Sequence, residues 1–235
     1  AEKSDVQCPM FDAENSWLFL DASGVSARVG VWQKARWLGW AEGEAGALES
    51  LFAGTRAALA QAGIPWEKLG GYLYVEGPGS VLGLRLAAMA IRAWQVDDAA
   101  RDAGRARPTW ACGSLQLAAA LALAGGAQPP FTVFTDARQG FWQILEIKSS
   151  DPAGLSAAAP VEIKESELPA GPLFHIPARK AWHHPPTAAR PMPASLREHP
   201  EILSRAELFR PVETPTPYAG RPPEYKKWAG APASR

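Results

Sequence analysis

The sequence of 235 residues predicts an α/β fold made of two lobes of the same type, the second of them reduced. Three observations support this: the order of elements in the first half, a repeat of the opening strand pattern near residue 131, and a high proline content after Ser150. The first-half order, three strands followed by helix, strand, helix, strand and helix, is that of a ribonuclease H-like lobe, the unit of the actin-like architecture. We expect a flexible leader over 1–16, an N-terminal lobe over 17–128 and a smaller C-terminal lobe over 129–235.

The first lobe opens with short apolar segments separated by turns. Trp17–Asp21, Ala27–Trp32 and Ala35–Trp40 predict three consecutive antiparallel strands. A helix is expected over 45–62, where Leu48, Leu51 and Phe52 have helical spacing. The remaining elements are expected in chain order: a buried strand at Tyr72–Val75, a helix at Leu84–Val96, a strand at Thr109–Cys112, and a helix from Ser114 to Ala124.

The second lobe begins with a strand at Phe131–Asp136, a short turn and a strand at Phe141–Ile147, which repeats the beginning of the first lobe. Sixteen of the 22 prolines follow Ser150. Because proline cannot donate to a strand ladder, no large sheet is expected there. The expected elements are strands at Val161–Ile163 and Leu173–Ile176 and a helix near Glu201–Phe209.

Composition excludes several classes of protein. Lysine plus arginine and aspartate plus glutamate both number 24, so the basic surplus of a phosphate-neutralising nucleic-acid protein is absent. The cysteines, Cys8 and Cys112, are far apart, which argues against a disulfide framework or a cysteine-rich zinc site and fits a reducing compartment. The longest apolar stretch, 117–124, is too short to span a membrane, and 1–16 lacks the apolar core of a signal peptide. We expect a cytoplasmic protein without membrane contact.

The most specific segment runs from Gly77 to Arg85. Glycine permits backbone conformations that other residues avoid, Pro78 stiffens the turn, and Ser80 can cap the helix that follows. Two interpretations stay open: a tight strand-to-helix turn, or an anion cradle at a helix N-terminus. The Gly-Lys-Ser/Thr sequence that ends a P-loop is absent from this segment.

This segment carries a resemblance. Gly77-Pro78-Gly79-Ser80 with Gly83-Leu84-Arg85 resembles the GPGSFTGxR signature of the bacterial TsaB (YeaZ) family. Three further segments match in order: the strand Leu18–Asp21, Asp136-Ala137-Arg138 followed by Gly140, and Pro217-Tyr218 with Arg221 and Lys226–Trp228. The matches extend from residue 17 to 228. Val81-Leu82 departs from the signature, and so the chain resembles a divergent member.

The resemblance implies an actin-like fold without independent catalysis. It implies a scaffold that pairs with the paralogous TsaD in forming N6-threonylcarbamoyladenosine at position 37 of tRNAs, with the ATPase TsaE as third member. It further implies tRNA contact only through the complex, no intrinsic cofactor, and ATP or ADP with magnesium only at a complex interface.

The two helices of the first lobe are the expected partner interface. The helix at 84–94 is apolar around most of its circumference and must be covered on more than one side. A TsaD partner or a second copy could cover the outer side, although burial wholly within the chain stays open. The candidate interface residues are Leu48, Leu51, Phe52, Leu84, Leu86 and Met89.

The alternative is an actin-like nucleotide-binding hydrolase. Asp21, Glu76 and Asp136 each follow a strand, and in facing lobes Asp21 and Asp136 could border a cleft for magnesium-nucleotide. The competing interpretation is that each acid caps its own turn. The candidate anion or nucleotide contacts are Asp21, Gly77, Pro78, Gly79, Ser80, Gly83, Arg85, Asp136 and Arg138. No histidine precedes His175, whereas the catalytic paralog carries a metal-binding histidine pair in its first lobe, and no metal site is expected.

Overall fold

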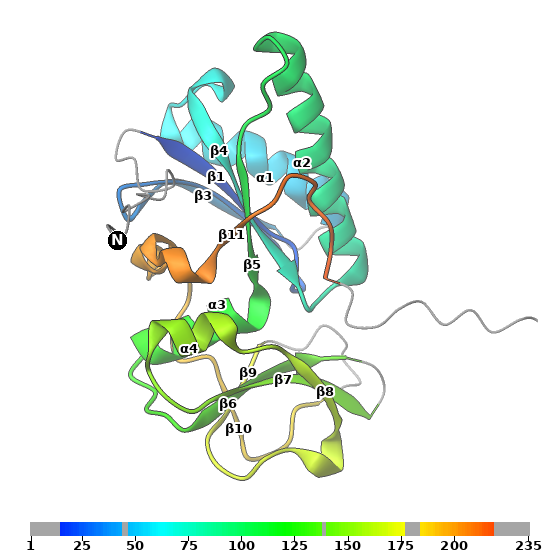
Figure 1. The fold of residues 1–235 in the computed structure, drawn as a ribbon, viewed down its shortest axis with the longest axis vertical. Coiled ribbons are helices and arrows are strands. Elements are labelled where there is room, and N and C mark those ends of the chain that lie inside the picture. The colour runs from blue at the N-terminus through cyan, green and yellow to red at the C-terminus, as the bar shows by residue number, and fades with distance from the viewer. Residues whose placement is uncertain (1–14, 44–46, 138–139, 177–183, 219–235) are drawn as a thin grey trace, which may run out of the picture.

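A computed structural model of the chain describes residues 15–43, 47–137, 140–176 and 184–218, without the side chains of residues 47, 48, 152, 153 and 156 (Figure 1). It contains two mixed sheets, one in each lobe, with a helix between them. The predicted two-lobe α/β class is therefore confirmed. The expected leader lies outside the described residues up to residue 14, and the first strand begins at Ser16.

The first sheet has six strands in the order β11-β5-β4-β1-β2-β3. Their bounds are β1 Ser16–Asp21, β2 Ala27–Gln33, β3 Arg36–Gly43, β4 Leu69–Gly77, β5 Thr109–Gly113 and β11 Arg210–Pro211. β1, β2 and β3 form the predicted antiparallel meander, while β4 pairs with β1 in parallel and β5 pairs with β4 in parallel. The carboxyl ends of β1, β4 and β5 therefore lie at one edge of the sheet.

The second sheet has five strands in the order β10-β9-β6-β7-β8. Their bounds are β6 Phe131–Asp136, β7 Phe141–Ile147, β8 Val161–Lys164, β9 Leu173–His175 and β10 Ala189–Pro191. β6, β7 and β8 are antiparallel, and β9 and β10 add in parallel, so the predicted internal repeat is present. As expected for the proline-rich part after Ser150, its strands are short: β8, β9 and β10 have four, three and three residues. The proline-containing strand β10, which was not predicted, lies at the edge, where a missing donor costs little.

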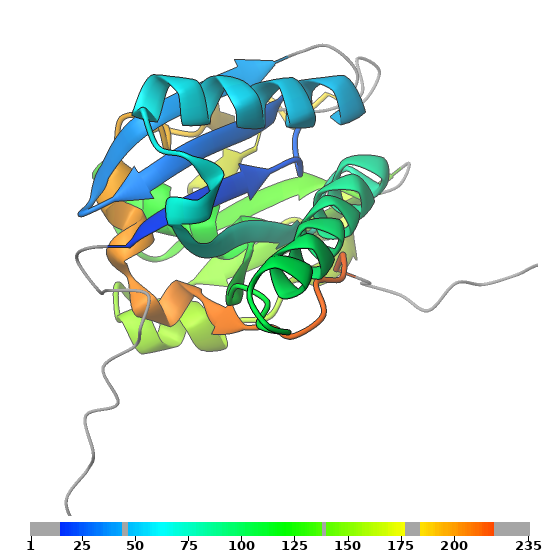
Figure 2. The same cartoon turned by 90° about the horizontal axis from the view of Figure 1, so that it is seen from above.

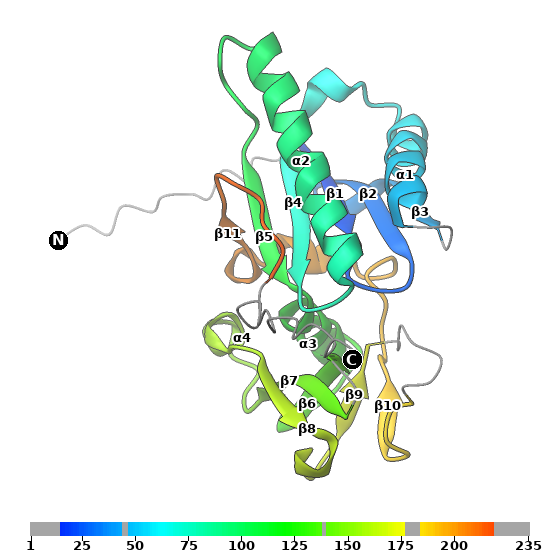
Figure 3. The same cartoon turned by 90° about the vertical axis from the view of Figure 1, so that its right-hand side faces the viewer.

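Four α-helices are present in the described part of the chain: α1 Ala47–Ala62, α2 Val81–Arg101, α3 Ser114–Ala124 and α4 Pro152–Ala157. α1 and α2 cover one face of the first sheet, where Leu18 and Leu20 of β1 meet Leu51 and Ile91. Figures 2 and 3 show both helices in the first lobe, with the second sheet beyond it. No described helix combines the length and apolar character needed to cross a bilayer.

α3 lies between the two sheets and is buried around most of its circumference. Leu115, Leu117 and Leu121 are at most 6% exposed. They share a cluster with Phe19 of the first sheet and Val133 of the second. Packing of α3 on both sheets holds the lobes together.

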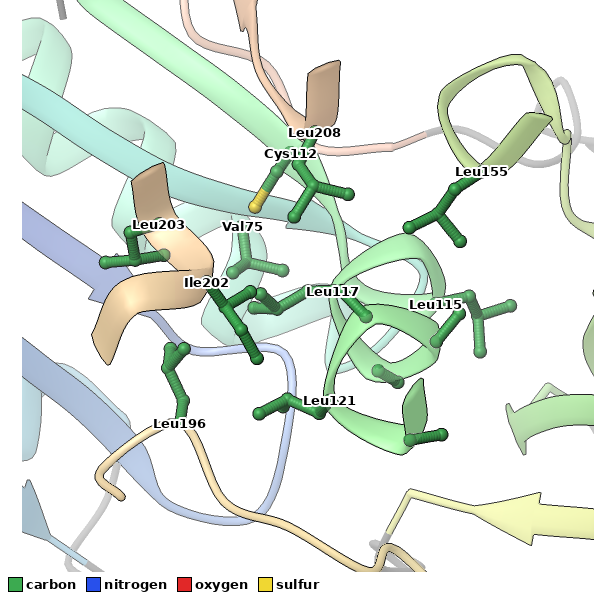
Figure 4. Packing of buried hydrophobic residues seen from close by; sticks show 14 of the residues in the cluster. Val75, Cys112, Leu115, Leu117, Leu121, Leu155, Leu196, Ile202, Leu203 and Leu208 are labelled. Atoms are coloured by element: carbon green, nitrogen blue, oxygen red, sulfur yellow. The ribbon is translucent and has the colours of Figure 1, made fainter. Parts of the chain in front are cut away.

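After β10 the chain returns to the first lobe. Two 3₁₀ turns, Pro200–Ser204 and Ala206–Leu208, replace the helix predicted near 201–209, because Arg205 between them is extended. Their side chains pack beside Val75, Cys112 and α3 (Figure 4), and β11 then pairs with β5. The predicted division, which gave all of 129–235 to the second lobe, does not include this return.

Two tryptophans of the first sheet hold the returning segment. Trp32 Nε1 donates to the carbonyl oxygen of Pro200 at 2.8 Å, and Trp37 Nε1 donates to that of Leu196 at 3.0 Å. Both hydrogen bonds join residues far apart in the sequence, and so they fix the first sheet to the chain that leaves the second lobe.

Candidate functional site

The turn that links β4 to α2 is packed against the turn that links β1 to β2. Gly77 has φ +120°, a conformation that favours glycine. A β-carbon at Gly79 would lie 2.4 Å from the carbonyl oxygen of Ser23, and one at Gly83 would lie 2.1 Å from that of Ala22. The glycines therefore permit two backbone turns to touch.

Hydrogen bonds complete this contact. Ser80 N donates to the carbonyl oxygen of Ser23 at 2.8 Å, and Gly83 N donates to Ser80 Oγ at 3.3 Å, which caps α2. The carbonyl oxygen of Pro78 accepts from Ser114 Oγ at 2.5 Å. Since the chain's own backbone fills the space at the start of α2, this geometry favours the tight-turn interpretation of the motif over the anion cradle.

Asp21 is engaged in its own turn. Its side chain is buried, its Oδ1 accepts from Ser23 N at 2.9 Å and from Ser23 Oγ at 2.6 Å, and its Oδ2 accepts from Arg28. Both carboxylate oxygens are thus used within the first lobe, as the turn-capping interpretation requires.

Asp136 occupies the equivalent place at the end of β6 and is also buried. It does not line either of the cavities between the lobes that are described below, one of which is lined by Asp21. The structure therefore does not bring the two aspartates to one of these cavities. Arg138 lies outside the described residues.

Two cavities flank α3 between the lobes. The first, of about 390 Å³, lies below the β1–β2 turn and is lined by Asp21, Arg28, Leu117 and Ile176 among others. The second, of about 290 Å³, lies at the carboxyl ends of β4 and β5. It is lined by residues that include Glu76, Cys112, Gln116, Arg210 and Tyr218.

The second cavity offers no reactive nucleophile. Burial, with Asp21 and Glu76 nearby, raises the pKa of the Cys112 thiol well above its usual range. A protonated buried thiol is unreactive. Burial also raises the pKa of Tyr218, and Glu76 is paired with Arg210. The polar side chains around this cavity therefore hold segments of the fold together and supply no reactive group.

Metal ligands do not converge in the described part of the chain, where no group of three histidine, cysteine or acidic side chains comes together. His175 is half-buried beside Phe134, with ring centroids 6.2 Å apart. His199 Nδ1 lies 2.9 Å from Glu201 Oε1 at the surface. His183 lies outside the described residues.

The exterior of α1 and α2 carries several exposed apolar side chains. Leu82, Met89 and Val96 of α2 are 64%, 63% and 72% exposed, and Phe52 of α1 is 37% exposed. Their spacing of seven residues places the three α2 side chains on one face of the helix. We call the exposed side chains of α1 and α2 the α1–α2 face.

Part of the predicted interface is corrected. Leu51 and Leu84, 0% and 2% exposed, lie in the interior and cannot meet a partner in this conformation. The prediction placed both at the interface because helical spacing alone does not distinguish the side of a helix that packs on the sheet from the opposite side. Phe52 and Met89 are exposed, Leu86 is half-buried against the core cluster beneath the helices, and of Leu48 only the backbone is described.

Sequence patterns missed several residues that tie distant segments together. Tyr72 donates to Asp98 Oδ2 at 2.7 Å, and Arg107 pairs with the same buried carboxylate. Together with the Trp32 and Trp37 bonds, these contacts join residues without a shared motif. Asp98 lies near the C-terminal end of α2 and the sequence gives no sign that it is buried, so no local pattern pointed to this network.

These features define an actin-like, two-lobe α/β protein. Two solved structures are similar over most of the chain. One, YeaZ from Pseudomonas aeruginosa, has 18% sequence identity and a TM-score of 0.57, covering 82% of this chain and 90% of its own. The other, an uncharacterized protein with similarity to peptidase YeaZ from Pseudomonas aeruginosa, has 20% identity and a TM-score of 0.60, covering 88% and 100%. No family model matches the chain, and no curated protein matches it.

Proposed function

We propose that this chain is a non-catalytic, cytoplasmic accessory subunit of the YeaZ type that works by binding a larger partner. The observation that carries the proposal is the exposed apolar α1–α2 face. The acid of the first motif, Asp21, supports it by being fully engaged in the fold.

The α1–α2 face has the composition of a protein-binding surface. Large exposed apolar side chains grouped on one side of a domain mark interaction sites. Around Met89 the apolar residues are interleaved with Arg85 and Arg92, and both arginine and methionine are enriched in interfaces. Phe52 of α1 packs edge-on against Trp94 of α2, with ring centroids 6.1 Å apart, and this contact joins the two helices.

The charges of this face favour a different protein over a second copy. Between Val81 and Val96, α2 carries Arg85 and Arg92 and no acidic residue, and Arg56 is exposed on α1. None of the three arginines has an ion-pair partner within the described ranges. The exposed acids of the two helices lie at helix ends: Glu49 in the first turn of α1, and Asp97 near the end of α2, where it is paired with Arg101. An isologous dimer would place like charges in the same interface, whereas a partner with acidic and apolar side chains would neutralise them.

The partner that fits the resemblance is the TsaD paralog, with the TsaE ATPase as a further member of the assembly. In this role the chain activates formation of N6-threonylcarbamoyladenosine at position 37 of tRNA and meets tRNA only through the complex. ATP or ADP and magnesium would then bind at a complex interface, and this chain would supply no cofactor site of its own.

The test is co-purification with the TsaD paralog of the same organism. We expect a stable complex with the unaltered chain. Met89→Glu, which places a charge in the centre of the face, is expected to abolish it. Val161→Glu is the matched control, because Val161 is 55% exposed on the second lobe and should leave the complex intact.

Failure to form a complex with or without nucleotide would contradict the proposal. Equal loss in both variants would contradict the location of the interface. Tight binding of magnesium-ATP by the isolated chain would instead favour the nucleotide-binding hydrolase.

A further inference from the structure

The 390 Å³ cavity between the lobes has the size and construction of a small-molecule site. Sites of this kind range from roughly 300 to 1,000 Å³ and combine apolar walls with a few polar groups. α3 forms one wall with Leu117 and Leu121, and Ile176 and Met192 of the second half of the chain form another. Both lobes therefore contribute to a single apolar interior.

The charges at the cavity are predominantly negative. Four charged side chains line it: Asp21, Arg28, Glu42 and Glu198. One cation against three carboxylates leaves a formal charge of 1 − 3 = −2. Arg28 is paired with Asp21 and also lies opposite Glu42 across the β2–β3 pair, so Glu198 carries the least compensated charge. Neither Glu42 nor Glu198 has an ion-pair partner among the residues the structure describes.

Glu198 is oriented by a neighbour. Ser195 Oγ, which also lines the cavity, donates to Glu198 Oε2 at 2.7 Å. The carboxylate is exposed at the mouth of the cavity, where a ligand can reach it without deep desolvation of the acid.

The positive end of α3 does not reverse this balance. Ser114, the first residue of α3, lines the cavity, but its hydroxyl donates to the carbonyl oxygen of Pro78. A helix end corresponds to roughly half a unit charge, which is smaller than the two carboxylate charges. Phosphate groups require several donors and cations, and the single arginine here is engaged.

We propose that this cavity binds a small organic cation, with its ammonium group at Glu198 and Glu42 and its apolar body against Leu117 and Leu121. The site goes beyond the proposed partner-binding function and lies on a different side of the first lobe from the α1–α2 face. Because residues of both lobes line the cavity, a bound ligand contacts both of them.

The experiment is calorimetric titration of the full chain at pH 7 with two probes of the same shape and opposite charge, phenethylamine and 3-phenylpropionate. Phenethylamine is expected to bind and 3-phenylpropionate to bind at least about tenfold more weakly, which corresponds to about 1.4 kcal/mol. Glu198→Gln should weaken phenethylamine binding by up to about fivefold, the value of one exposed ion pair. Glu146→Gln, an exposed acid of β7 outside this cavity, should leave it unchanged.

Three results would overturn the proposal: no phenethylamine binding at millimolar concentration, equal affinity for both probes, or equal affinity in the Glu198→Gln variant and the unaltered chain. Competition between magnesium-ATP and phenethylamine would also overturn it, since the cavity would then accept anions. A Met89→Glu variant that fails to bind TsaD but still binds phenethylamine separates this site from the partner interface.

Discussion

The two lobes share a sheet topology but differ in what covers the sheet. In both, three antiparallel strands are extended by two parallel ones, β4 and β5 in the first and β9 and β10 in the second. In the first lobe, α1 and α2 cover the face that points away from α3. The corresponding face of the second sheet has a small cluster around Phe134 and Trp142, and no α-helix of the described residues packs on it.

This difference shows that the topology does not require the two helices. The second sheet forms without counterparts of α1 and α2, using short strands and an aromatic pair whose ring centroids are 5.0 Å apart. We therefore attribute the retention of long helices in the first lobe to the surface they present as well as to the core they cover.

The largest expected effect compares the stability contributed by the face of the first sheet under α1 and α2 with that of the second-sheet face that no described α-helix covers. Leu51→Ala removes a fully buried side chain beneath α1 and should lower the free energy of unfolding by about 3 kcal/mol. Ile163→Ala, on partly buried Ile163 of β8, should cost only about 1 kcal/mol. Urea unfolding of both variants checks this. An equal loss in the free energy of unfolding would mean that the cover of α1 and α2 does not make side chains beneath them more important for stability.

The next effect tests the contact between turns in the first lobe. Gly83→Ala places a β-carbon 2.1 Å from the carbonyl oxygen of Ala22, and the resulting shift of α2 should cost about 2 to 3 kcal/mol. Gly154→Ala in α4 meets no described atom closer than 3.5 Å and should leave stability unchanged or raise it by up to about 1 kcal/mol, because alanine favours a helix. A tolerated Gly83→Ala would indicate that the turn has room for a ligand after all.

A third prediction concerns alkaline pH. Burial, followed by the hydrogen bond to Asp98, raises the pKa of Tyr72 above that of an unfolded chain, about 10. The folded state keeps the proton that the unfolded state loses, so this contribution is fully present below pH 10 and is lost as pH rises above it. Tyr72→Phe should make the fall in stability between pH 9 and 11 shallower. Identical slopes in urea titrations would contradict this assignment.

The smallest effect tests the return from the second lobe to the first. Trp37→Phe removes the hydrogen bond to the carbonyl oxygen of Leu196 and should cost about 1 kcal/mol. The returning segment should then separate from the first sheet more readily, which faster hydrogen exchange of the amides of Ile202 and Leu208 would report. Unchanged exchange would mean that α3 alone fixes the lobes.

Local patterns predicted most of the sheet but only half of the site. Alternating apolar residues fix β1 to β3 and β6 to β7, and the glycine motif predicts the start of α2 within four residues. Periodicity could not say which side of α1 faces inward, and so Leu51 was predicted at the interface together with Phe52, although it is buried. The return of 196–211 to the first lobe depends on long-range contacts of Trp32 and Trp37 that no local pattern encodes.

The most direct test of the partner-binding account is oxidative footprinting of the complex with the TsaD paralog. Met89 is 63% exposed on the α1–α2 face, whereas Met192 is partly buried beside the interlobe cavity. We predict that complex formation slows oxidation of Met89 at least about tenfold and leaves Met192 unchanged. An unchanged rate at Met89 in a verified complex would contradict the account.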